Sequence, residues 1–69
     1  MTMFEYIKDL VQGKELPWMG QNEDGEFVII EDGACEYCLC FKVTTVQDND
    51  WLRINHYYED GTVEETYRK

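Results

Sequence analysis

The stretch from Tyr37 to Val46 constrains the fold more than any other part of this 69-residue chain. Aromatic and apolar residues occupy every second position along one side of it, namely Tyr37, Leu39, Phe41 and Val43. A period of two with β-branched and aromatic residues predicts a strand with one buried face. Segments that could form strands lie before and after it, so we expect this stretch to be a central strand.

The N-terminal segment carries the signals of a helix. Thr2 and Glu5 form a T-x-x-E capping box, and Gly13 can supply the left-handed residue that ends a helix. The sequence therefore predicts a helix from about Met3 to Gln12. Its apolar stripe would consist of Met3, Ile7 and Leu10, widened by Phe4, Tyr6 and Val11. About ten residues are too few for an isolated helix to persist, so this helix should pack on the sheet.

Three turns divide the remaining chain into strands. Asp32-Gly33 and Asp60-Gly61 fit two-residue hairpin turns, and residues 47–50 fit a four-residue turn. The first strand would cover 26–31. The predicted pairs are Val28 with Tyr37, Phe41 with His56, Val43 with Ile54, His56 with Glu65 and Tyr58 with Val63. This register places Leu52, Ile54, His56 and Tyr58 on the core face.

The segment 14–24 reads as a connection because Pro17 breaks a helix. Its apolar residues Leu16, Trp18 and Met19 have two interpretations. They either cover one end of a thin hydrophobic core or form an exposed anchor for a partner. The second interpretation is supported by the enrichment of Trp and Met at interface cores.

These elements predict one small α+β domain over residues 1–69, with one N-terminal α-helix packed on a four-stranded antiparallel β-meander. A chain of this size buries only about 60% of the surface that its unfolded form exposes. The core should therefore be one thin layer. We expect it to contain Leu39, Phe41, Val43, Ile54, Ile7 and Leu10.

The second face of the sheet should be exposed or covered by a partner or a second copy, because one short helix cannot cover both faces. The predicted register places seven aromatic, apolar and thiol side chains on it: Phe27, Ile29, Cys38, Cys40, Val46, Trp51 and Tyr57. A patch of this extent is unusual on a monomer. Aromatic sheets also bind RNA, but they need basic surroundings, which an acidic chain does not offer.

The three cysteines and the single histidine raise the question of a metal. Cys35, Cys38 and Cys40 could form a Cys₃His zinc site with His56. In the predicted register Cys38 and Cys40 share one face, while Cys35 and His56 share the other. Four ligands cannot converge through a sheet, so we expect no metal, no cofactor and free thiols.

No group of residues suggests catalysis. The predicted His56–Glu65 pair could transfer protons, but no nucleophile or oxyanion donor accompanies it. A histidine satisfied by a neighbouring acid is the simpler interpretation. We therefore expect a protein that is not an enzyme.

The charge is strongly negative. The chain has 15 Asp and Glu residues against 6 Lys and Arg residues, a formal net charge of −9. Such a surface repels nucleic acid and anionic membranes and attracts basic surfaces, although acidity also serves solubility. The sequence shows no apolar run of about 20 residues and no basic region at its start, so we expect neither a membrane span nor a signal peptide. Three cysteines in a chain without an expected signal peptide indicate free thiols in the reducing cytoplasm.

The acidic residues occur in small clusters that lie mostly at the predicted turns and strand ends. In size, charge, α+β pattern and lack of catalytic residues, the chain resembles the small acidic inhibitors made by phages and mobile elements, of the anti-CRISPR and anti-restriction type. The resemblance implies binding to the basic nucleic-acid channel of a host defence complex in the host cytoplasm, as a DNA mimic. The residues expected to bind the partner are Glu31, Asp32, Glu36, Glu59, Asp60, Glu64, Glu65, Trp18 and Trp51.

A second hypothesis is a cytoplasmic interaction module, either a monomer or a homodimer through the aromatic sheet face. Salt separates the two hypotheses, because binding of a nucleic-acid mimic should weaken strongly with salt, whereas a hydrophobic dimer should be nearly indifferent to it.

Overall fold

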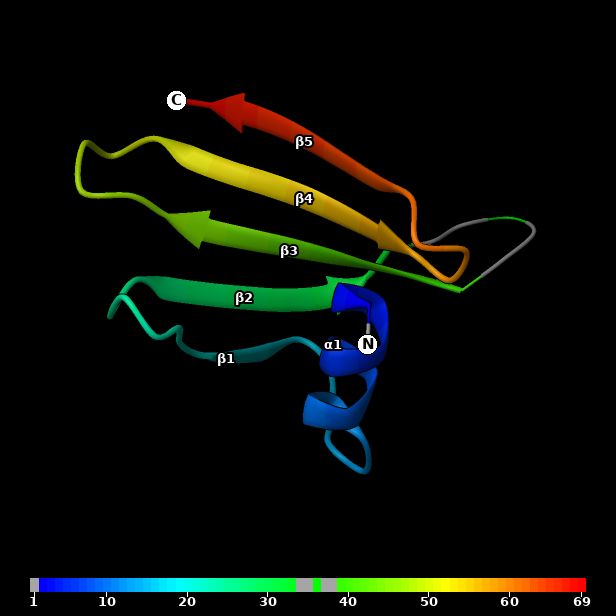
Figure 1. Cartoon of the computed structure of the whole chain (residues 1–69). Helices are drawn as coiled ribbons and strands as arrows, with labels where there is room; N and C mark the ends of the chain where they lie inside the picture. Colours follow the sequence, from blue (N-terminus) through cyan, green and yellow to red (C-terminus); the bar gives the residue numbers. More distant parts are fainter. Residues whose placement is uncertain (1, 34–35, 37–38) are drawn as a thin grey trace.

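The structure, a computed structural model, describes residues 2–33, 36 and 39–69. Within this part of the chain the elements are α1 (Met3–Val11), β1 (Trp18–Gln21), β2 (Phe27–Asp32), β3 (Cys40–Val46), β4 (Leu52–Tyr58) and β5 (Val63–Arg68). The strands form an antiparallel sheet in the order β1-β2-β3-β4-β5, and α1 runs across it (Figure 1). The α+β class is confirmed, but the predicted four-stranded sheet is wrong because the sheet has five strands.

The helix begins and ends with the predicted caps. The Thr2 side chain accepts a hydrogen bond from the Glu5 amide at 3.2 Å. At the other end, Gly13 has a φ of +76° and follows the last helical turn directly. The buried residues Phe4, Ile7 and Val11 all belong to the predicted stripe, but Met3 and Tyr6 are 48% and 50% exposed. The buried stripe is therefore narrower than predicted.

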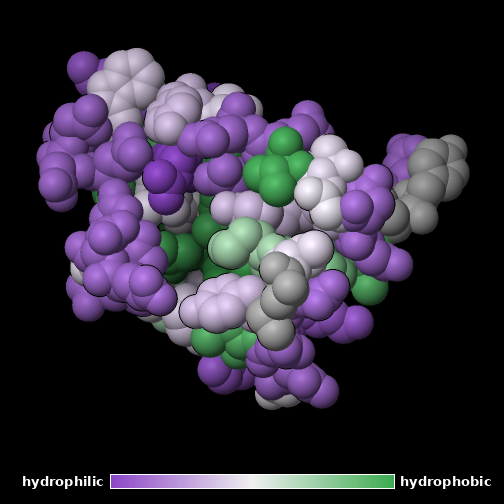
Figure 2. Space-filling model, in the orientation of Figure 1, coloured by the Kyte–Doolittle hydropathy of each residue, from purple (hydrophilic) through white to green (hydrophobic). Residues whose placement is uncertain are grey.

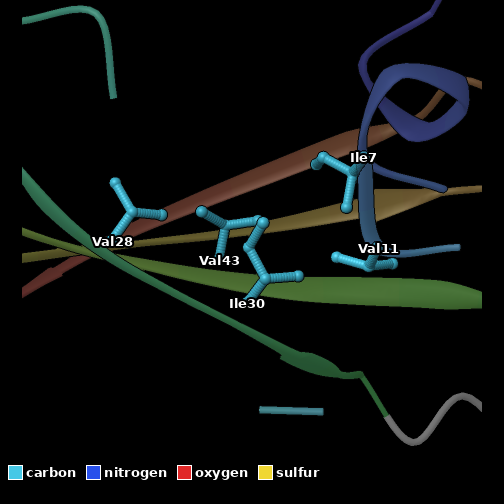
Figure 3. Close-up of a cluster of buried hydrophobic side chains, with 5 residues drawn as sticks. All are labelled: Ile7, Val11, Val28, Ile30 and Val43. Carbon is cyan, nitrogen blue, oxygen red and sulfur yellow. The ribbon is translucent and has the colours of Figure 1, made fainter. Parts of the chain in front are cut away.

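The core lies between α1 and the sheet. Figure 3 shows the helix side chains directed at those of β2 and β3, in a cluster of Ile7, Val11, Val28, Ile30 and Val43. Phe4 extends the cluster by packing on Phe41, with the ring centroids 5.2 Å apart. The sheet side that α1 covers is called the helix face below, and the other side the open face.

The predicted core is only partly right. Ile7 and Val43 are in the cluster, and Leu10 and Phe41 are partly buried against it. Ile54 is buried but lies on the open face, since it pairs with Thr44. Leu39 is 59% exposed and precedes β3, so its prediction is wrong.

Three of the hairpin turns share one geometry. In each, the residue that closes the hairpin donates its amide to the carbonyl of the residue four positions on: Asn22 to Glu26, Gln47 to Trp51 and Tyr58 to Thr62. The last loop residue has a positive φ in each case, at Gly25 (+80°), Asp50 (+67°) and Gly61 (+92°). These are three-residue loops with a left-handed third residue.

This turn geometry corrects the predicted register of β4. The predicted four-residue loop would pair Val46 with Trp51, whereas Val46 pairs with Leu52 and Phe41 with Tyr57. A shift of one residue moves every side chain of a strand to the other face. The helix face therefore receives Arg53, Asn55 and Tyr57. The open face receives the four residues predicted for the core, Leu52, Ile54, His56 and Tyr58.

The last hairpin also differs by one residue. Tyr57 rather than Tyr58 pairs with Val63, and His56 pairs with Glu64 rather than Glu65. The predicted two-residue turn is wrong because Glu59 belongs to the loop as well. The predicted register is wrong by one residue between β3 and β4 and again between β4 and β5. The two shifts cancel at β5, so Val63 lies on the helix face as predicted.

The predicted Asp32-Gly33 turn is also wrong. β2 pairs with β3 through Ile30 and Val43, and residues 33–39 connect the two strands. Val28, whose predicted partner was Tyr37, pairs with Thr45, and Tyr37 lies outside the described residues. The Gly33 amide donates to the Cys40 carbonyl at 3.0 Å, which closes the connection at the strand ends.

The strand β1 lies inside the predicted connection 14–24. Trp18 pairs with Ile30 and Gln21 with Phe27. Four residues are too few to show an alternating pattern, and Gly20 is a poor strand former. The structure therefore adds an edge strand that the sequence did not reveal.

Asp50 offers a test of the turn geometry. A non-glycine residue with a positive φ is strained, and glycine removes this strain. We expect Asp50→Gly to raise the free energy of unfolding by about 0.5–1 kcal/mol, measured by urea denaturation. The matched control is Asp48→Gly in the same loop, which removes the same charge from a residue without a positive φ. A gain of equal size in the control would contradict the strain at Asp50.

Candidate protein-binding surfaces

The seven acids predicted to bind a partner lie at one end of the sheet, which we call the acidic end. This end contains the last residues of β2, the β4–β5 turn and the first residues of β5 (Figure 1), and Glu36 lies between β2 and β3 in the chain. The Glu59 amide donates to the Leu39 carbonyl at 3.2 Å, which joins the two loops. The acids are Glu31, Asp32, Glu36, Glu59, Asp60, Glu64 and Glu65.

The negative charge is unevenly distributed over the molecule. Seven acidic residues and one basic residue, Lys42, give the acidic end a net charge of −6 out of −9 for the whole chain. The opposite end has five acids in its two turns and three bases, Arg53, Arg68 and Lys69, so its net charge is −2. All charged residues belong to the described part of the chain. The acidic end is thus the main source of negative potential.

The acids do not share one flat surface. On the open face, Glu31, Lys42, His56 and Glu64 follow one another across four strands. The two outer carboxylates are therefore separated by a base and a histidine. Asp32 and Glu65 lie on the helix side of the sheet, opposite Phe41 and Asn55. The seven acids are therefore gathered at the tip of the sheet rather than on either of its faces.

Hydrogen bonds fix several of these carboxylates. Asp60 accepts from the Thr62 amide at 2.9 Å, and the hydrogen bonds from Thr62 lower the pKa of Asp60. The Tyr58 hydroxyl donates to Glu64, and the Tyr67 hydroxyl donates to Glu65 at 2.5 Å, which raises the pKa of Tyr67. Asp60 therefore keeps its charge at a lower pH than a free aspartate does.

The two tryptophans are not part of the acidic end. Trp18 starts β1 and lies half-buried against the core, with the Lys14 ammonium 5.8 Å from its ring centroid. Trp51 directly precedes β4 at the opposite end and is 37% exposed, with the Lys69 ammonium 5.9 Å from its ring. The prediction grouped them with the acids, but the structure separates them.

The open face is apolar over its half remote from the acidic end. Phe27 and Met19 are 43% and 61% exposed, and Ile29, Val46 and Leu52 are half-buried beside them. The predicted composition of this face is right for Phe27, Ile29, Cys40 and Val46. It is wrong for Tyr57, which lies on the helix face. Trp51 precedes β4 and belongs to no strand, and Cys38 is outside the described residues.

The predicted separation of Cys40 from His56 is wrong, because the corrected register places both on the open face. Cys40 is buried, and the His56 ring stacks on Tyr58 with centroids 6.4 Å apart. Within residues 2–33, 36 and 39–69, no group of three or more His, Cys, Asp or Glu side chains could hold a metal ion. Cys35 and Cys38 lie outside this part, so the absence of zinc stays a prediction.

A cleft between α1 and the sheet was missed by the sequence analysis. It measures about 160 Å³ and is lined by apolar core residues and by Tyr6, Trp18, Arg53 and Tyr57. Burial raises the pKa of Tyr57; the charge of Arg53 lowers it and that of Glu65 raises it further. The cleft depends on β1 and on the corrected register of β4, neither of which the sequence pattern revealed.

The described part of the chain contains no helix that is long and apolar enough to cross a membrane. Comparison of the chain with protein-family models, with curated proteins and with solved structures gives no match in any of the three.

Proposed function

We propose that this chain is a small acidic inhibitor that binds the basic surface of a nucleic-acid-binding host defence complex and blocks access to it. This is the mode of action implied by its resemblance to anti-CRISPR and anti-restriction proteins. The observation that supports it is the charge of the acidic end, −6 out of −9. The inhibitor acts in the host cytoplasm and binds neither nucleic acid nor membranes.

The geometry of the acidic end suits this role. DNA carries one negative charge per about 1.7 Å of its axis, so a protein that imitates it needs several carboxylates in a small space. Glu59 and Asp60 lie in a tight turn, and Glu31, Glu64 and Glu65 lie on strands. Carboxylates on such a scaffold are already positioned before binding, which reduces the entropy lost on association. They also attract a basic partner from a distance and increase the association rate.

The open face supports a second candidate, an interaction module that pairs through its apolar half. Phe27 and Met19 are exposed there, and no helix covers them within the described part of the chain. Such a module would be a homodimer or would bind an apolar partner surface. Sedimentation at low and high salt separates this candidate from the first, because an apolar interface persists at high salt.

The test of the first candidate has two steps. Immobilised chain is incubated with a bacterial lysate at low salt, and bound proteins are eluted with high salt. Each eluted protein is then purified, and its binding to DNA is measured with and without the chain. We expect nucleic-acid-binding proteins that elute with salt and that lose DNA when the chain is added.

Two results contradict the proposal. One is capture that does not respond to salt. The other is a captured protein that keeps its DNA at saturating concentrations of the chain, which would show that the bound surface is not the nucleic-acid channel.

A further inference from the structure

The cleft between α1 and the sheet has the size of one aromatic side chain. Its volume is about 160 Å³, and an apolar cavity of about 150 Å³ takes up benzene. The buried side chains of Val28, Ile30 and Val43 line it. Figure 2 shows hydrophobic side chains at the bottom of a hollow on this side of the molecule, with hydrophilic ones around it.

The cleft exists because α1 is short and because β1 carries a glycine at the right place. α1 has nine residues, so it covers part of the helix face only. The Trp18 ring lies over Gly20, since a Cβ atom at Gly20 would be 2.5 Å from the indole. The absence of this atom lets the indole lie close to the strand and form one wall, while Tyr6 from α1 helps to line the cleft.

The surroundings of the cleft favour a cationic ligand. A second hollow shares Met3, Tyr6, Gln21 and Asn22 with the cleft and continues to the carboxylates of Glu23 and Asp24. Among the described residues, Arg53 is the cation that lines the cleft, and the Lys14 ammonium lies 5.8 Å from the ring of Trp18, which forms one wall. The charge of Glu65 acts on the Tyr57 pKa in the opposite direction to that of Arg53. A second copy of the chain would add another net charge of −9 and be repelled.

We propose that the cleft is a docking site for a basic protein segment that presents one aromatic side chain between lysines or arginines. The aromatic ring enters the cleft, and the flanking cations lie near Glu23 and Asp24. This inference rests on the proposed function only in expecting a basic partner. It uses a different surface from the acidic end, so either can fail without the other.

The test uses capped pentapeptides and the fluorescence of Trp18 in a Trp51→Phe background, which leaves one tryptophan as reporter. We expect the peptide KKFKK to bind at least about tenfold more tightly than KKAKK, because burial of the phenyl ring accounts for most of the affinity. We expect EEFEE to show no binding. Equal binding of KKFKK and KKAKK would overturn the inference. So would binding of EEFEE as tight as that of KKFKK, which would indicate a site for uncharged apolar ligands.

Two tyrosine variants locate the site. Tyr6→Ala removes a lining residue of the cleft and should weaken KKFKK binding at least about fivefold, by loss of apolar contact. Tyr67→Ala is the matched control, because Tyr67 is 52% exposed against 50% for Tyr6 and does not line the cleft. Proton–nitrogen correlation spectra confirm that both variants fold. An equal effect of both variants, or loss of peptide binding on Glu31→Lys at the acidic end, would overturn the inference.

Discussion

Ile30→Ala is expected to lower the free energy of unfolding by about 2–5 kcal/mol. Ile30 is 3% exposed and contacts the core cluster between α1 and the sheet. Removing its side chain therefore leaves a cavity in a core that is one layer thick. A domain of this length has a total stability of about 3–10 kcal/mol, so urea denaturation followed by circular dichroism should show a large shift or an unfolded variant.

Leu39→Ala is the control for this prediction. The sequence pattern places Leu39 in the core, whereas the structure leaves it 59% exposed. An exposed substitution usually changes stability by less than about 0.5 kcal/mol. A loss on Leu39→Ala as large as that on Ile30→Ala would contradict the register of β2 and β3.

Reversing three charges at the acidic end is expected to weaken partner binding about 10–100-fold, because each exposed ion pair contributes at most about 1 kcal/mol. The variant combines Glu31→Lys, Glu36→Lys and Glu59→Lys. It avoids Asp60, Glu64 and Glu65, which accept hydrogen bonds within the fold. Three reversals change the charge by six, so the net charge of this end goes from −6 to zero. Binding is measured by calorimetry against the partner found by capture.

The matched control reverses three exposed acids elsewhere, Asp9, Glu15 and Asp48. It changes the total charge by the same amount but leaves the acidic end and the cleft intact. We expect this control to retain most of the affinity. Equal losses in both variants would mean that only the total charge matters. Retained binding in the first variant, together with loss on Phe27→Ala, would favour the interaction module of the open face.

The sequence predicted the helix well because its signals are local. Thr2, Glu5 and Gly13 act within one turn of the helix ends. The structure confirms the hydrogen bond from the Glu5 amide to the Thr2 side chain and the left-handed Gly13. The other hydrogen bond of the capping box, from the Thr2 amide to the Glu5 carboxylate, stays a prediction. The β4 register failed because Gln47 and Trp51 close a three-residue loop, whereas four loop residues were predicted. The last residue of the loop, Asp50, adopts a conformation that usually needs glycine, so the sequence did not indicate the shorter loop. No local signal distinguishes these two loop lengths.

The candidate surfaces also differ in how far the sequence could predict them. The gathering of acids at the turns could be predicted, since turns are exposed wherever they are placed. The cleft could not, because it needs Trp18 of β1 and Tyr57 of β4 on one face, and both depended on pairings that the pattern missed. Properties of single segments were therefore predictable, whereas sites built from several strands required the register.

The strands lie in the sheet in the same order as in the chain, which affects the rate of folding. Each strand pairs with the one that precedes it, and three of the four hairpins close over three residues. Closing a short loop costs little chain entropy, and folding is fast when contacts are close in sequence. The connection 33–39 is the long exception. The core cluster takes residues from both sides of this connection. We therefore expect the pairing of β2 with β3, together with the docking of α1, to limit the folding rate.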